Sequence, residues 1–420
     1  MSSPSHPFSN KLDVVLKLAE RCNLACPYCY YFFQENNPNA NRPLIDRETI
    51  VHLAQWLRRG AHDLALKNLF LGLHGGEPLL LPKKRFDEYV GILRQHLDDR
   101  VDLAISIQTN GTLIDAEWID LFEKHRIIVG ISLDGPEPLH DASRPDHKGR
   151  GSYQATVRGL RLVQEAVAAG RLPPTGILCV ANPEHDGEAV ARHIIEDLGI
   201  DSFNLLLPRE GHDSPIWRDQ QKWIAYFRGV MKAWQASARD EQGRRRQVVI
   251  YLLSRMVSAM TNERRATEND WLQAGKQNII TISSEGHIQL DDNVIALDDR
   301  LCRTDQTIFD TELLEFVSGD LWQELVHAVQ TVPTQCSVCD WLRSCRSGYL
   351  YNRYSKQNGF LNASAACETL DALHHMLLPL AAEMVGIEAV AEILGRRPDY
   401  QASNLALDGN RTLMGAPFDV

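Results

Sequence analysis

Three cysteines in one short stretch constrain this chain more than any other feature. Cys22, Cys26 and Cys29 follow the apolar run 14–18, with three and then two residues between them. A closed zinc site needs a fourth nearby Cys or His ligand, and this stretch offers none. Three thiolates suit a four-iron cluster that keeps one iron free of protein ligands, because Cys thiolates are the standard holders of such clusters. An iron that is open in this way can bind a small molecule.

The same stretch has an aromatic residue, Tyr28, directly before the third cysteine. Cys-x3-Cys-x-aromatic-Cys resembles the signature of the radical S-adenosylmethionine (SAM) enzymes. The resemblance implies that the three cysteines hold a [4Fe-4S] cluster whose open iron binds the methionyl amine and carboxylate of SAM. It also implies that the reduced cluster gives SAM one electron, which yields methionine and a 5′-deoxyadenosyl radical that takes hydrogen from an unactivated carbon.

Composition narrows the class of protein. The 420 residues include 44 basic and 55 acidic side chains, for a formal net charge of −11. The one basic run, at 244–246, is short, which argues against nucleic acid as the main partner. Residues 1–10 have no apolar signal core, and no apolar run approaches the roughly 20 residues of a membrane span. We therefore expect a cytoplasmic protein without membrane or nucleic-acid partners, with one large α/β domain and a smaller one.

Short apolar runs alternate with longer amphipathic stretches through the first half of the chain. Six strands alternating with helices predict parallel strands with right-handed crossovers, and an open or partial (β/α)6 barrel is the natural closure. The chemistry of such a barrel is expected at the carboxyl ends of its strands. The expected strands lie near 13–18, 69–74, 103–108, 127–133, 176–181 and 203–207, and the helices near 47–59, 84–97, 116–124, 152–169 and 187–198.

Polar or glycine-rich residues follow the second, third and fourth predicted strands, just as the cysteines follow the first. Gly75 and Gly76 allow backbone to approach a ligand closely, and Glu77 can accept from a cationic amine. In the family resembled, this Gly-Gly-Glu equivalent contacts the SAM amino group. Groups suited to ribose hydroxyls and the SAM carboxylate are supplied by Thr109, Asn110, Ser132 and Asp134. Any one of these clusters alone would be interpreted as a plain turn. Because they follow successive strands after the cysteine motif, the clusters together predict one SAM site.

Further residues after the fourth strand narrow the resemblance. They are 132–136, His140, Asp141, Arg144 and 149–153. This segment is similar to radical SAM enzymes that modify peptides or proteins and carry a C-terminal cysteine-rich SPASM or twitch extension. Anaerobic sulfatase-maturing enzymes and ribosomal-peptide maturases belong to that group. We assign Arg144 and Tyr28 to the SAM site. A loop ion-pair network is the alternative for His140, Asp141 and Arg144.

The loop after the sixth predicted strand contains Leu205–Pro208 and Gly211–Pro215. It looks like the corresponding loop of cyclophane-forming peptide maturases. The alternative for His212 and Asp213 is a turn with a solvated aspartate.

A second group of cysteines has Cys-x2-Cys-x5-Cys spacing and a distant fourth member. It consists of Cys336, Cys339, Cys345 and Cys367. Four thiolates can complete a tetrahedral zinc site, so zinc is the alternative here. Beside the first motif, the group resembles the SPASM element, which implies one auxiliary [4Fe-4S] cluster and two clusters in total. Cys302 is expected to be a buried free thiol, with a spare ligand as the alternative, and Cys179 belongs to the core.

Two departures from the SPASM pattern concern a further, inner cluster. Tyr349 stands where another cysteine is expected, and Asp291 and Asp292 stand at the end of a predicted hairpin at 281–291. The inner auxiliary cluster is therefore expected to be absent. Either aspartate is a candidate general base, and a solvated turn is the alternative for both.

Together these features predict an α/β chain with a partial (β/α)6 radical SAM barrel and a C-terminal SPASM-like iron–sulfur cluster domain. The expected bounds are 1–215 for the barrel, 216–278 for a helical bridge, 279–372 for the cluster domain and 373–420 for a C-terminal helix and tail. The expected substrate is a side chain of a ribosomally made precursor peptide, which becomes joined to an aromatic ring by a C–C bond (a cyclophane). The alternatives are anaerobic sulfatase maturation, which forms formylglycine, and a zinc-binding interaction protein.

The chemistry implies partners beside the precursor peptide. A reductant such as flavodoxin or ferredoxin is expected to supply electrons. Residues 1–12 are too few to bury a leader-binding core of their own. The leader is therefore expected to bind at an exposed strand edge or on a separate leader-binding protein, with weak dependence on salt. Binding of an acidic leader to the basic run 244–246 is the less favoured alternative.

Overall fold

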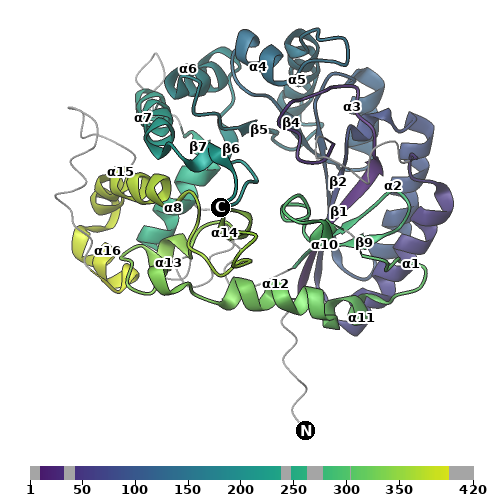
Figure 1. The fold of residues 1–420 in the computed structure, drawn as a ribbon. Helices are drawn as coiled ribbons and strands as arrows, with labels where there is room; N and C mark the ends of the chain where they lie inside the picture. The colour runs from purple at the N-terminus through teal and green to yellow at the C-terminus, as the bar shows by residue number, and fades with distance from the viewer. Residues whose placement is uncertain (1–9, 33–42, 238–246, 263–277, 303, 397–420) are drawn as a thin grey trace. The chain divides into compact units, whose positions relative to one another are not determined.

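The computed structural model describes residues 10–32, 43–237, 247–262, 278–302 and 304–396, without the side chains of Asp299 and Cys302. The basic run 244–246 and the predicted role of the Cys302 side chain therefore lie outside the described residues. The chain divides into two compact units (Figure 1). The first comprises Met1–Leu133, Glu137–Ile177 and Lys276–His327, and the second comprises Asp134–Pro136, Leu178–Gly275 and Ala328–Val420.

The first unit is built around strand β1 (Lys11–Ala19). On one side of it lie β2 (Asn68–Gly75), β3 (Asp102–Thr109) and β4 (Ile128–Ser132), all parallel. On the other side β8 (Ile279–Ile282) pairs in parallel with β1, and β9 (Ile288–Gln289) pairs antiparallel with β8. The strands are apolar on both faces over much of their length because parallel sheets are covered on both sides.

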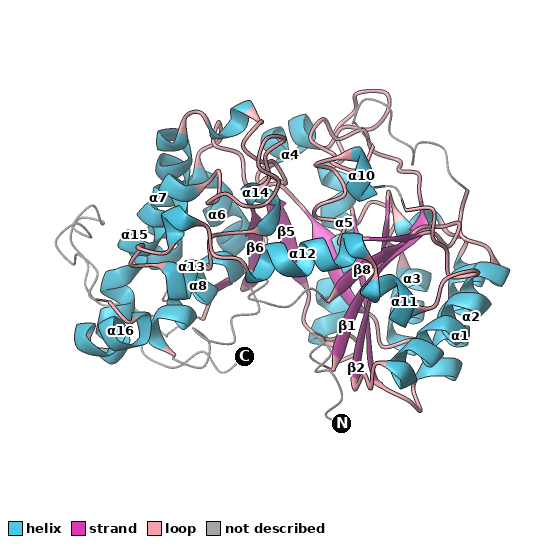
Figure 2. Cartoon of the chain, turned by 60° about the horizontal axis from the view of Figure 1, so that its bottom comes forward, coloured by secondary structure: helices cyan, strands magenta, loops and turns pink. Residues whose placement is uncertain are grey.

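Helices connect these strands and cover one face of the sheet (Figure 2). They are α1 (Arg47–Asp63), α2 (Lys83–Leu97), α3 (Ala116–Lys124), α4 (Glu137–Ser143) and α5 (Tyr153–Ala168). In α1, the Asp46 side chain caps the helix by accepting from Thr49 N–H. Ile50, Leu53 and Leu57 then recur at helical spacing and are fully buried. Later in the chain come α10 (Asp299–Cys302), α11 (Leu313–Ser318) and α12 (Asp320–Gln330), which runs on into the second unit.

The second unit combines a short parallel strand pair with helices. Strand β5 (Gly176–Val180) begins in the first unit and ends in the second, and β6 (Ser202–Leu206) pairs in parallel with β7 (Val249–Ile250). The helices are α6 (Gly187–Arg192), α7 (Gln220–Ala236), α8 (Tyr251–Thr261), α13 (Leu342–Cys345), α14 (Leu350–Arg353), α15 (Cys367–Val385) and α16 (Ile387–Leu394). A π-helix at His193–Asp197 extends α6. Trp223 and Trp234 anchor the core, and the Trp234 indole N–H donates to Val248 O at 2.9 Å.

The predicted α/β class is confirmed. All six predicted strands are present within two residues of the expected bounds, and the sheet is open and mostly parallel, as in a partial barrel. The predicted hairpin is also present, but its first strand, β8, joins the sheet beside β1. The compact units therefore divide the chain differently from the predicted domain bounds, which remain a prediction.

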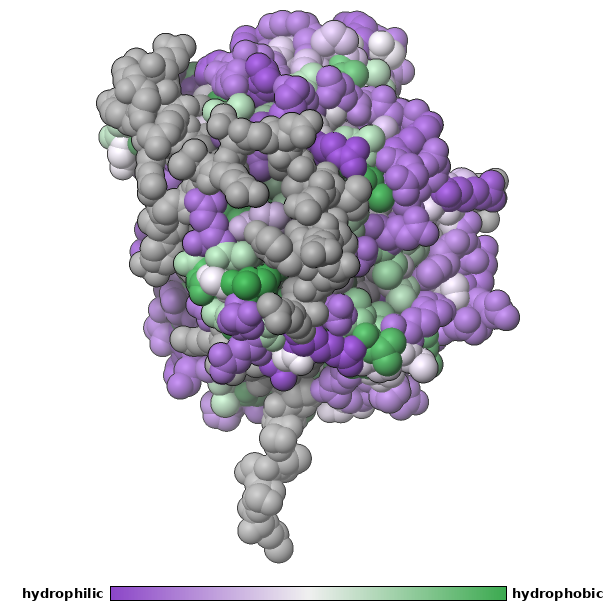
Figure 3. Space-filling model, turned by 90° about the vertical axis from the view of Figure 1, so that its left-hand side faces the viewer, coloured by the Kyte–Doolittle hydropathy of each residue, from purple (hydrophilic) through white to green (hydrophobic). Residues whose placement is uncertain are grey.

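The described helices include none with the length and apolarity needed to cross a membrane. On the face drawn in Figure 3 the described residues are mostly hydrophilic, with small separate hydrophobic patches.

Candidate active site

The loop after β1 carries the three cysteines of the first motif. Cys22, Cys26 and Cys29 are half-buried free thiols. The Leu24 backbone N–H donates to Cys22 Sγ at 3.4 Å. The pKa of the Cys22 thiol is raised to about 12, mainly by burial, with smaller contributions from the charges of Glu77, Cys26 and Cys29. The three thiols share one short loop, in which the Cys29 backbone N–H donates to Cys26 O at 3.0 Å, an arrangement that suits the ligands of one shared cluster.

The loop between α4 and α5 holds the cysteine loop from one side. Ala25 N–H donates to Pro145 O at 2.7 Å, and His147 Nε2 donates to Cys22 O at 2.8 Å. Both contacts are made to backbone atoms of the cysteine loop, so they help to fix its path.

The loop after β3 holds the cysteine loop from another side. The Asn110 side-chain amide donates to Asn23 Oδ1 at 2.9 Å, and Asn23 Nδ2 donates to Thr112 Oγ1 at 2.8 Å. Thr112 N–H and its hydroxyl donate in turn to Asn110 Oδ1 at 3.0 and 2.6 Å. This closed triangle places Asn110 beside Cys22, since its amide nitrogen lies 4.0 Å from Cys22 Sγ.

The two glycines at the end of β2 lie against the start of the cysteine loop. A Cβ added at Gly75, whose φ is +145°, would lie 2.2 Å from Ala19 O, and one added at Gly76 would lie 2.2 Å from Arg21 O. Gly76 N–H donates to Ala19 O at 2.7 Å. The close approach that requires glycine here is therefore between two segments of the chain itself. The predicted approach of both residues to a ligand remains a prediction.

Glu77 is fully buried between the ends of β2 and β3. Its carboxylate accepts from the Thr109 hydroxyl at 2.7 Å, from Asn110 N–H at 2.8 Å and from Leu79 N–H at 2.9 Å. Burial raises the pKa of Glu77 to about 7, although these three donors oppose the shift. A second effect of the carboxylate is to place negative charge beside Cys22. A cationic amine near Glu77 is the partner that would favour its ionised form.

The other predicted strand-end residues divide between the two units. Ser132, at the end of β4, accepts from the Gln108 amide at 2.9 Å in the first unit. Asp134 belongs to the second unit, where its carboxylate accepts from Val180 N–H at 3.0 Å. The structure thus brings Thr109 and Asn110 to the cysteine loop, whereas the described contact of Asp134 lies within the second unit.

Arg144 and Tyr28, both assigned to the site from sequence, face one another. The Arg144 guanidinium lies 5.5 Å from the centroid of the Tyr28 ring, which is 41% exposed. His140 contacts the Ser152 hydroxyl at 3.0 Å, and Asp141 accepts from Tyr153 N–H at 2.8 Å. The aromatic residue of the cysteine motif is therefore covered by a cation from the α4–α5 loop.

The two candidate bases at the end of the hairpin are buried, so the solvated-turn alternative is wrong. Asp292 is 4% exposed, and its Oδ2 accepts from Lys17 Nζ at 3.1 Å and from the Tyr30 hydroxyl at 2.5 Å. Asp291 instead accepts from the backbone and side-chain N–H groups of Asn293 at 3.0 and 2.6 Å. The geometry therefore separates Asp292, which faces β1 and the cysteine loop, from Asp291, which shapes its own turn.

The second group of cysteines comes together in the second unit. Burial raises the pKa of the Cys345 thiol strongly, and the charges of Cys367, Cys339 and Cys336 add to the shift. After Cys345 the chain turns sharply through three left-handed residues, Arg346, Ser347 and Gly348 (φ 51°, 68° and 78°). All four sulfurs are free thiols, and the Cys339 backbone N–H donates to Cys336 O at 3.1 Å.

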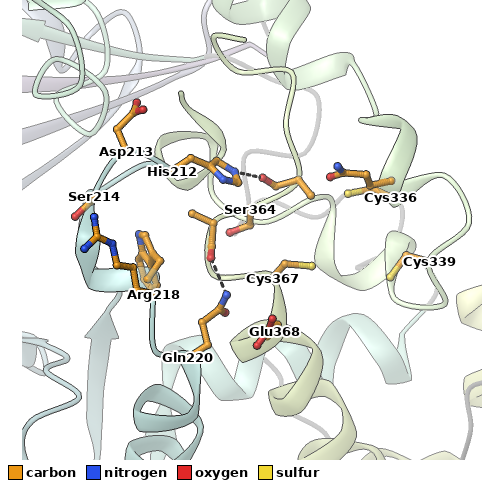
Figure 4. A pocket seen from close by; sticks show the side chains of 14 residues that line it. His212, Asp213, Ser214, Arg218, Gln220, Cys336, Cys339, Ser364, Cys367 and Glu368 are labelled. Carbon is orange, nitrogen blue, oxygen red and sulfur yellow. Dashed lines mark hydrogen bonds between the residues drawn. The ribbon is translucent and has the colours of Figure 1, made fainter. Parts of the chain in front are cut away.

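A pocket of about 480 Å³ lies beside these sulfurs, lined in part by Cys336, Cys339 and Cys367 (Figure 4). His212 lies on its wall and donates through Nε2 to Ala363 O at 2.8 Å. Among the described residues, no three His, Cys, Asp or Glu side chains converge closely enough for a single metal ion, as a zinc site would need. A donor set of four thiols, three of which line this pocket, fits a larger iron–sulfur cluster.

Comparison with known proteins decides the family. The family model described as the Radical SAM superfamily matches residues 16–190, the part of the chain that carries the cysteine loop and the strand ends just described. This chain is a radical SAM enzyme. This result excludes the alternative that the chain as a whole is a zinc-binding interaction protein.

Its relatives include sulfatase-maturating enzymes. A serine-type anaerobic sulfatase-maturating enzyme from Klebsiella pneumoniae is 26% identical over 339 residues, which cover 78% of each chain. A cysteine-type anaerobic sulfatase-maturating enzyme from Clostridium novyi (strain NT) is 23% identical over 374 residues, covering 85% of this chain and 93% of the relative. The solved structure of native anSMEcpe with bound AdoMet is 19% identical, with a TM-score of 0.75, and covers 89% of this chain and 98% of that one. The last comparison shows a shared fold.

Radical SAM enzymes use SAM and a [4Fe-4S] cluster, and the described residues fit both. Cys22, Cys26 and Cys29 offer three thiolates on one loop held by hydrogen bonds, which leaves one iron of a cubane without a protein ligand. Glu77 offers a buried carboxylate beside Cys22, and among the described residues its hydrogen-bond donors are one hydroxyl and two backbone N–H groups. The individual roles of these residues toward SAM remain predictions.

Glu77 is expected to make SAM binding depend on pH. Because its pKa is about 7, the carboxylate that pairs with an ammonium group becomes protonated as the pH falls through neutrality, and SAM affinity should fall with it. Glu77→Gln should bind SAM more weakly and lose this pH dependence between about pH 6 and about pH 8. Equilibrium dialysis of SAM with reconstituted protein measures both effects. Thr109→Ser is the matched control, since it keeps the hydroxyl that bonds Glu77, and an equal pH dependence in Glu77→Gln would contradict the assignment.

Sequence reasoning missed two buried charged residues of this radical SAM enzyme. Lys17 is 0% exposed and lies 4.4 Å from the centroid of the Tyr31 ring. Glu20 is equally buried and accepts from the Tyr31 hydroxyl and from Ser284 N–H, the latter at 2.9 Å. The available signal was a lysine inside the otherwise apolar run 14–18, followed three residues later by a glutamate just before the cysteines.

Proposed function

We propose that this radical SAM enzyme modifies a ribosomally made precursor peptide by joining a side-chain carbon to an aromatic ring through a C–C bond. The observation that carries the proposal is the buried carboxylate of Asp292, which contacts Lys17 and Tyr30 within the same unit as the cysteine loop. Tyr30 directly follows Cys29, so a proton acceptor is tied to the loop that holds the cluster.

The overall change removes two hydrogens from the peptide. When bound, SAM and the reduced cluster supply a radical that takes one hydrogen atom, and the auxiliary cluster supplies an acceptor for one electron. The peptide then gives up one proton as the new C–C bond forms and the ring regains its aromaticity. We infer that Asp292 Oδ2 takes that proton. The bond balance is one C–H broken at the side chain, one C–H broken at the ring and one C–C formed.

Asp292 is suited to hold and accept a proton because of its two neighbours. The Lys17 ammonium favours the ionised carboxylate, and a buried carboxylate without such a partner would be costly. The Tyr30 hydroxyl donates to the same oxygen and fixes its direction. General bases of this kind contribute about 10²–10⁴-fold to rate.

Two features support a cross-link as the product. Tyr349 and Asp291 stand where ligands of an inner auxiliary cluster are expected, so the ligand set differs from the full SPASM pattern. The loop that looks like that of cyclophane-forming maturases lies on the wall of the auxiliary-cysteine pocket, where Asp213 accepts from Lys356 N–H at 2.8 Å.

Sulfatase maturation is the second candidate, because relatives that cover most of this chain carry that name. It would oxidise a Cys or Ser to formylglycine, with one hydrogen atom taken from Cβ by the radical, one electron passing to the auxiliary cluster and the hydroxyl or thiol proton passing to Asp292. For Cys, water would then hydrolyse the thioaldehyde, with loss of hydrogen sulfide. A related solved structure contains a peptide, described as Kp18Cys, together with AdoMet. A peptide substrate is thus common to both candidates.

Product analysis separates the two candidates. Reconstituted enzyme, SAM and dithionite are incubated with a precursor peptide encoded beside the gene, and in parallel with a sulfatase-derived Cys peptide. A cross-link appears as loss of two hydrogens with no aldehyde, and fragment ions are missing between the joined residues. Formylglycine reacts with a hydrazide probe. Aldehyde formation in the sulfatase peptide, with an unchanged precursor, would overturn the cross-linking proposal in favour of the second candidate.

Cluster content tests the assignment of the cysteines. Seven cysteines in two groups predict two cubanes, so reconstituted protein should hold about eight irons, roughly four per cubane. Iron and sulfide analysis measures this. A value near twelve irons per chain would show a third cluster. It would contradict the prediction that Tyr349 and Asp291 stand in place of ligands of an inner auxiliary cluster.

The remaining partners stay proposals. A flavodoxin or ferredoxin would supply electrons, and the leader would bind a strand edge or a separate leader-binding protein. A cytoplasmic setting is proposed because free thiols and reduced clusters persist in a reducing compartment.

A further inference from the structure

Cys367 is the member of the second cysteine group that is most distant from the others in sequence. Cys336, Cys339 and Cys345 share one short segment, whereas residues 346–366 separate Cys345 from Cys367. Cys367 is exposed, whereas the other three thiols are buried or half-buried. The position of Cys367 therefore depends on the contacts that the connecting segment makes with the rest of its unit.

Residues 208–220, which follow β6, supply several of those contacts. Asn352 Nδ2 donates to Pro208 O at 2.9 Å, and the backbone N–H of His212 donates to Tyr354 O at 2.8 Å. The His212 ring contacts the same segment nearer to its end, through the bond to the carbonyl of residue 363 already described. The loop after β6 thus holds the connecting segment along its length.

Gln220, the first residue of α7, contacts the chain on both sides of Cys367 (Figure 4). Its side-chain Nε2 donates to Ala365 O at 3.1 Å. Its Oε1 accepts from the Thr369 N–H at 3.0 Å and from the Thr369 hydroxyl at 3.2 Å. Gln220 and Cys367 also line the same pocket. One side chain therefore holds the backbone two residues before the cysteine and two residues after it.

The bond from Thr369 to Gln220 caps the helix that begins with Cys367. The first N–H groups of a helix have no acceptor within it, and a side chain at the N-cap position ordinarily satisfies one of them. The N-cap residue of α15 is Ala366, whose side chain makes no such bond. Gln220 supplies the acceptor instead, from α7. The start of α15 is therefore fixed by a residue of another helix.

We propose that Gln220 is a positioning residue that holds Cys367 in place as the fourth ligand of the auxiliary cluster. The inference rests on the proposed function, which assigns a [4Fe-4S] cluster to Cys336, Cys339, Cys345 and Cys367. Each iron of that cubane then has one thiolate ligand. When the first turn of α15 frays, Cys367 moves with it and one iron loses its ligand. The cap from Gln220 opposes that fraying.

A complete ligand set matters for an electron acceptor. In the proposed reaction the auxiliary cluster takes one electron in each turnover and must be reoxidised before the next. An iron that has lost its protein ligand is released readily on oxidation, which leaves a [3Fe-4S] cluster. Gln220 touches neither substrate nor SAM in this account, and it acts on the electron acceptor through Cys367.

The test measures how firmly the auxiliary cluster keeps its fourth iron. The full chain is used in a triple variant that lacks the first group of cysteines, Cys22→Ala, Cys26→Ala and Cys29→Ala. The reconstituted protein is oxidised with ferricyanide, and the [3Fe-4S] signal is quantified by EPR together with the iron that passes to a chelator. The thermal unfolding midpoint is measured on the same samples.

Four further changes are compared in that background. Gln220→Ala removes both contacts, whereas Gln220→Glu keeps an oxygen that accepts from Thr369 N–H and loses the donor to Ala365 O. Gln221→Ala is the matched control, because Gln221 is the next residue of α7 and is exposed. Cys367→Ala removes the ligand itself and sets the full effect.

Gln220→Ala is expected to raise the fraction of clusters that lose one iron about fivefold, because loss of a cap increases the frayed population of a helix end by roughly that factor. Gln220→Glu and Gln221→Ala should stay close to the triple variant. Cys367→Ala should convert nearly every cluster to the [3Fe-4S] form.

Three outcomes would overturn the inference while leaving the cluster assignment in place. One is equal iron loss in Gln220→Ala and Gln221→Ala. Another is equal loss in Gln220→Ala and Gln220→Glu, since the second variant keeps the cap. The third is loss of all iron from Gln220→Ala with a lowered unfolding midpoint, which would show a general role in folding.

Failure of the proposed function gives a different result. Absence of any iron–sulfur signal in the triple variant, or an unchanged cluster in Cys367→Ala, would contradict the assignment of the ligands itself, whatever Gln220 does.

Discussion

Replacing Cys22, Cys26 and Cys29 by alanine is expected to abolish formation of 5′-deoxyadenosine. These thiols are the set that the structure gathers on one loop beside Glu77 and leaves one short of a cubane's four ligands. With dithionite and SAM, the triple variant should yield no 5′-deoxyadenosine by liquid chromatography, whereas the parent should yield it with or without peptide.

The second group of cysteines supplies the control for this prediction. The triple variant should keep about half of the parent's iron, roughly four per chain, and its thermal unfolding midpoint should remain near that of the parent. Undiminished SAM cleavage in a folded triple variant would show that another cluster binds SAM, and the assignment of the two cysteine groups would be wrong.

Replacing Asp292 by asparagine is expected to stop peptide modification while SAM cleavage continues. Asparagine keeps the shape of the side chain but cannot take up the released proton. Product formation should fall by about 10²–10⁴-fold, the usual contribution of a general base. The measurement compares the yield of 5′-deoxyadenosine with the yield of modified peptide, which should diverge in the variant and agree in the parent.

A buried lysine left without its partner complicates that variant. Breaking a buried ion pair from one side costs about 3–5 kcal/mol, so Asp292→Asn alone is expected to lose stability because Lys17 stays buried without its partner. The double variant Lys17→Met with Asp292→Asn removes both charges and should recover stability. If the double variant also recovers product, Asp292 acts through folding and not as a base. Persistent loss of product in the stable double variant is the expected result.

Much of the fold could be predicted from sequence because its signals are local. Alternation of apolar strands and amphipathic helices fixed the order of β1 to β6, and the position of the cysteines after β1 followed from chain order. The pairing of β8 with β1 could not be predicted, because residues 279–282 and 13–16 are distant in sequence and nothing in a four-residue apolar run identifies its neighbour. That pairing brings the end of the hairpin to β1 and so brings Asp292 to Lys17.

The candidate site was predicted in composition but less well in its contacts. Glu77, Thr109 and Asn110 were grouped correctly as strand-end residues, yet their described contacts are largely with one another and with the cysteine loop. Glycine is required at Gly75 and Gly76 because another segment of the chain passes close to their backbone, and that approach could not be predicted from the sequence.

The most direct test of the central claim follows deuterium from peptide to 5′-deoxyadenosine. A precursor peptide deuterated at its side-chain carbons is incubated with reconstituted enzyme, SAM and dithionite, and both products are analysed by mass spectrometry. We predict that one deuterium appears in 5′-deoxyadenosine for each cross-link formed, and that an unlabelled peptide gives none. Cross-linked or oxidised peptide accompanied by unlabelled 5′-deoxyadenosine would contradict abstraction from a side-chain carbon.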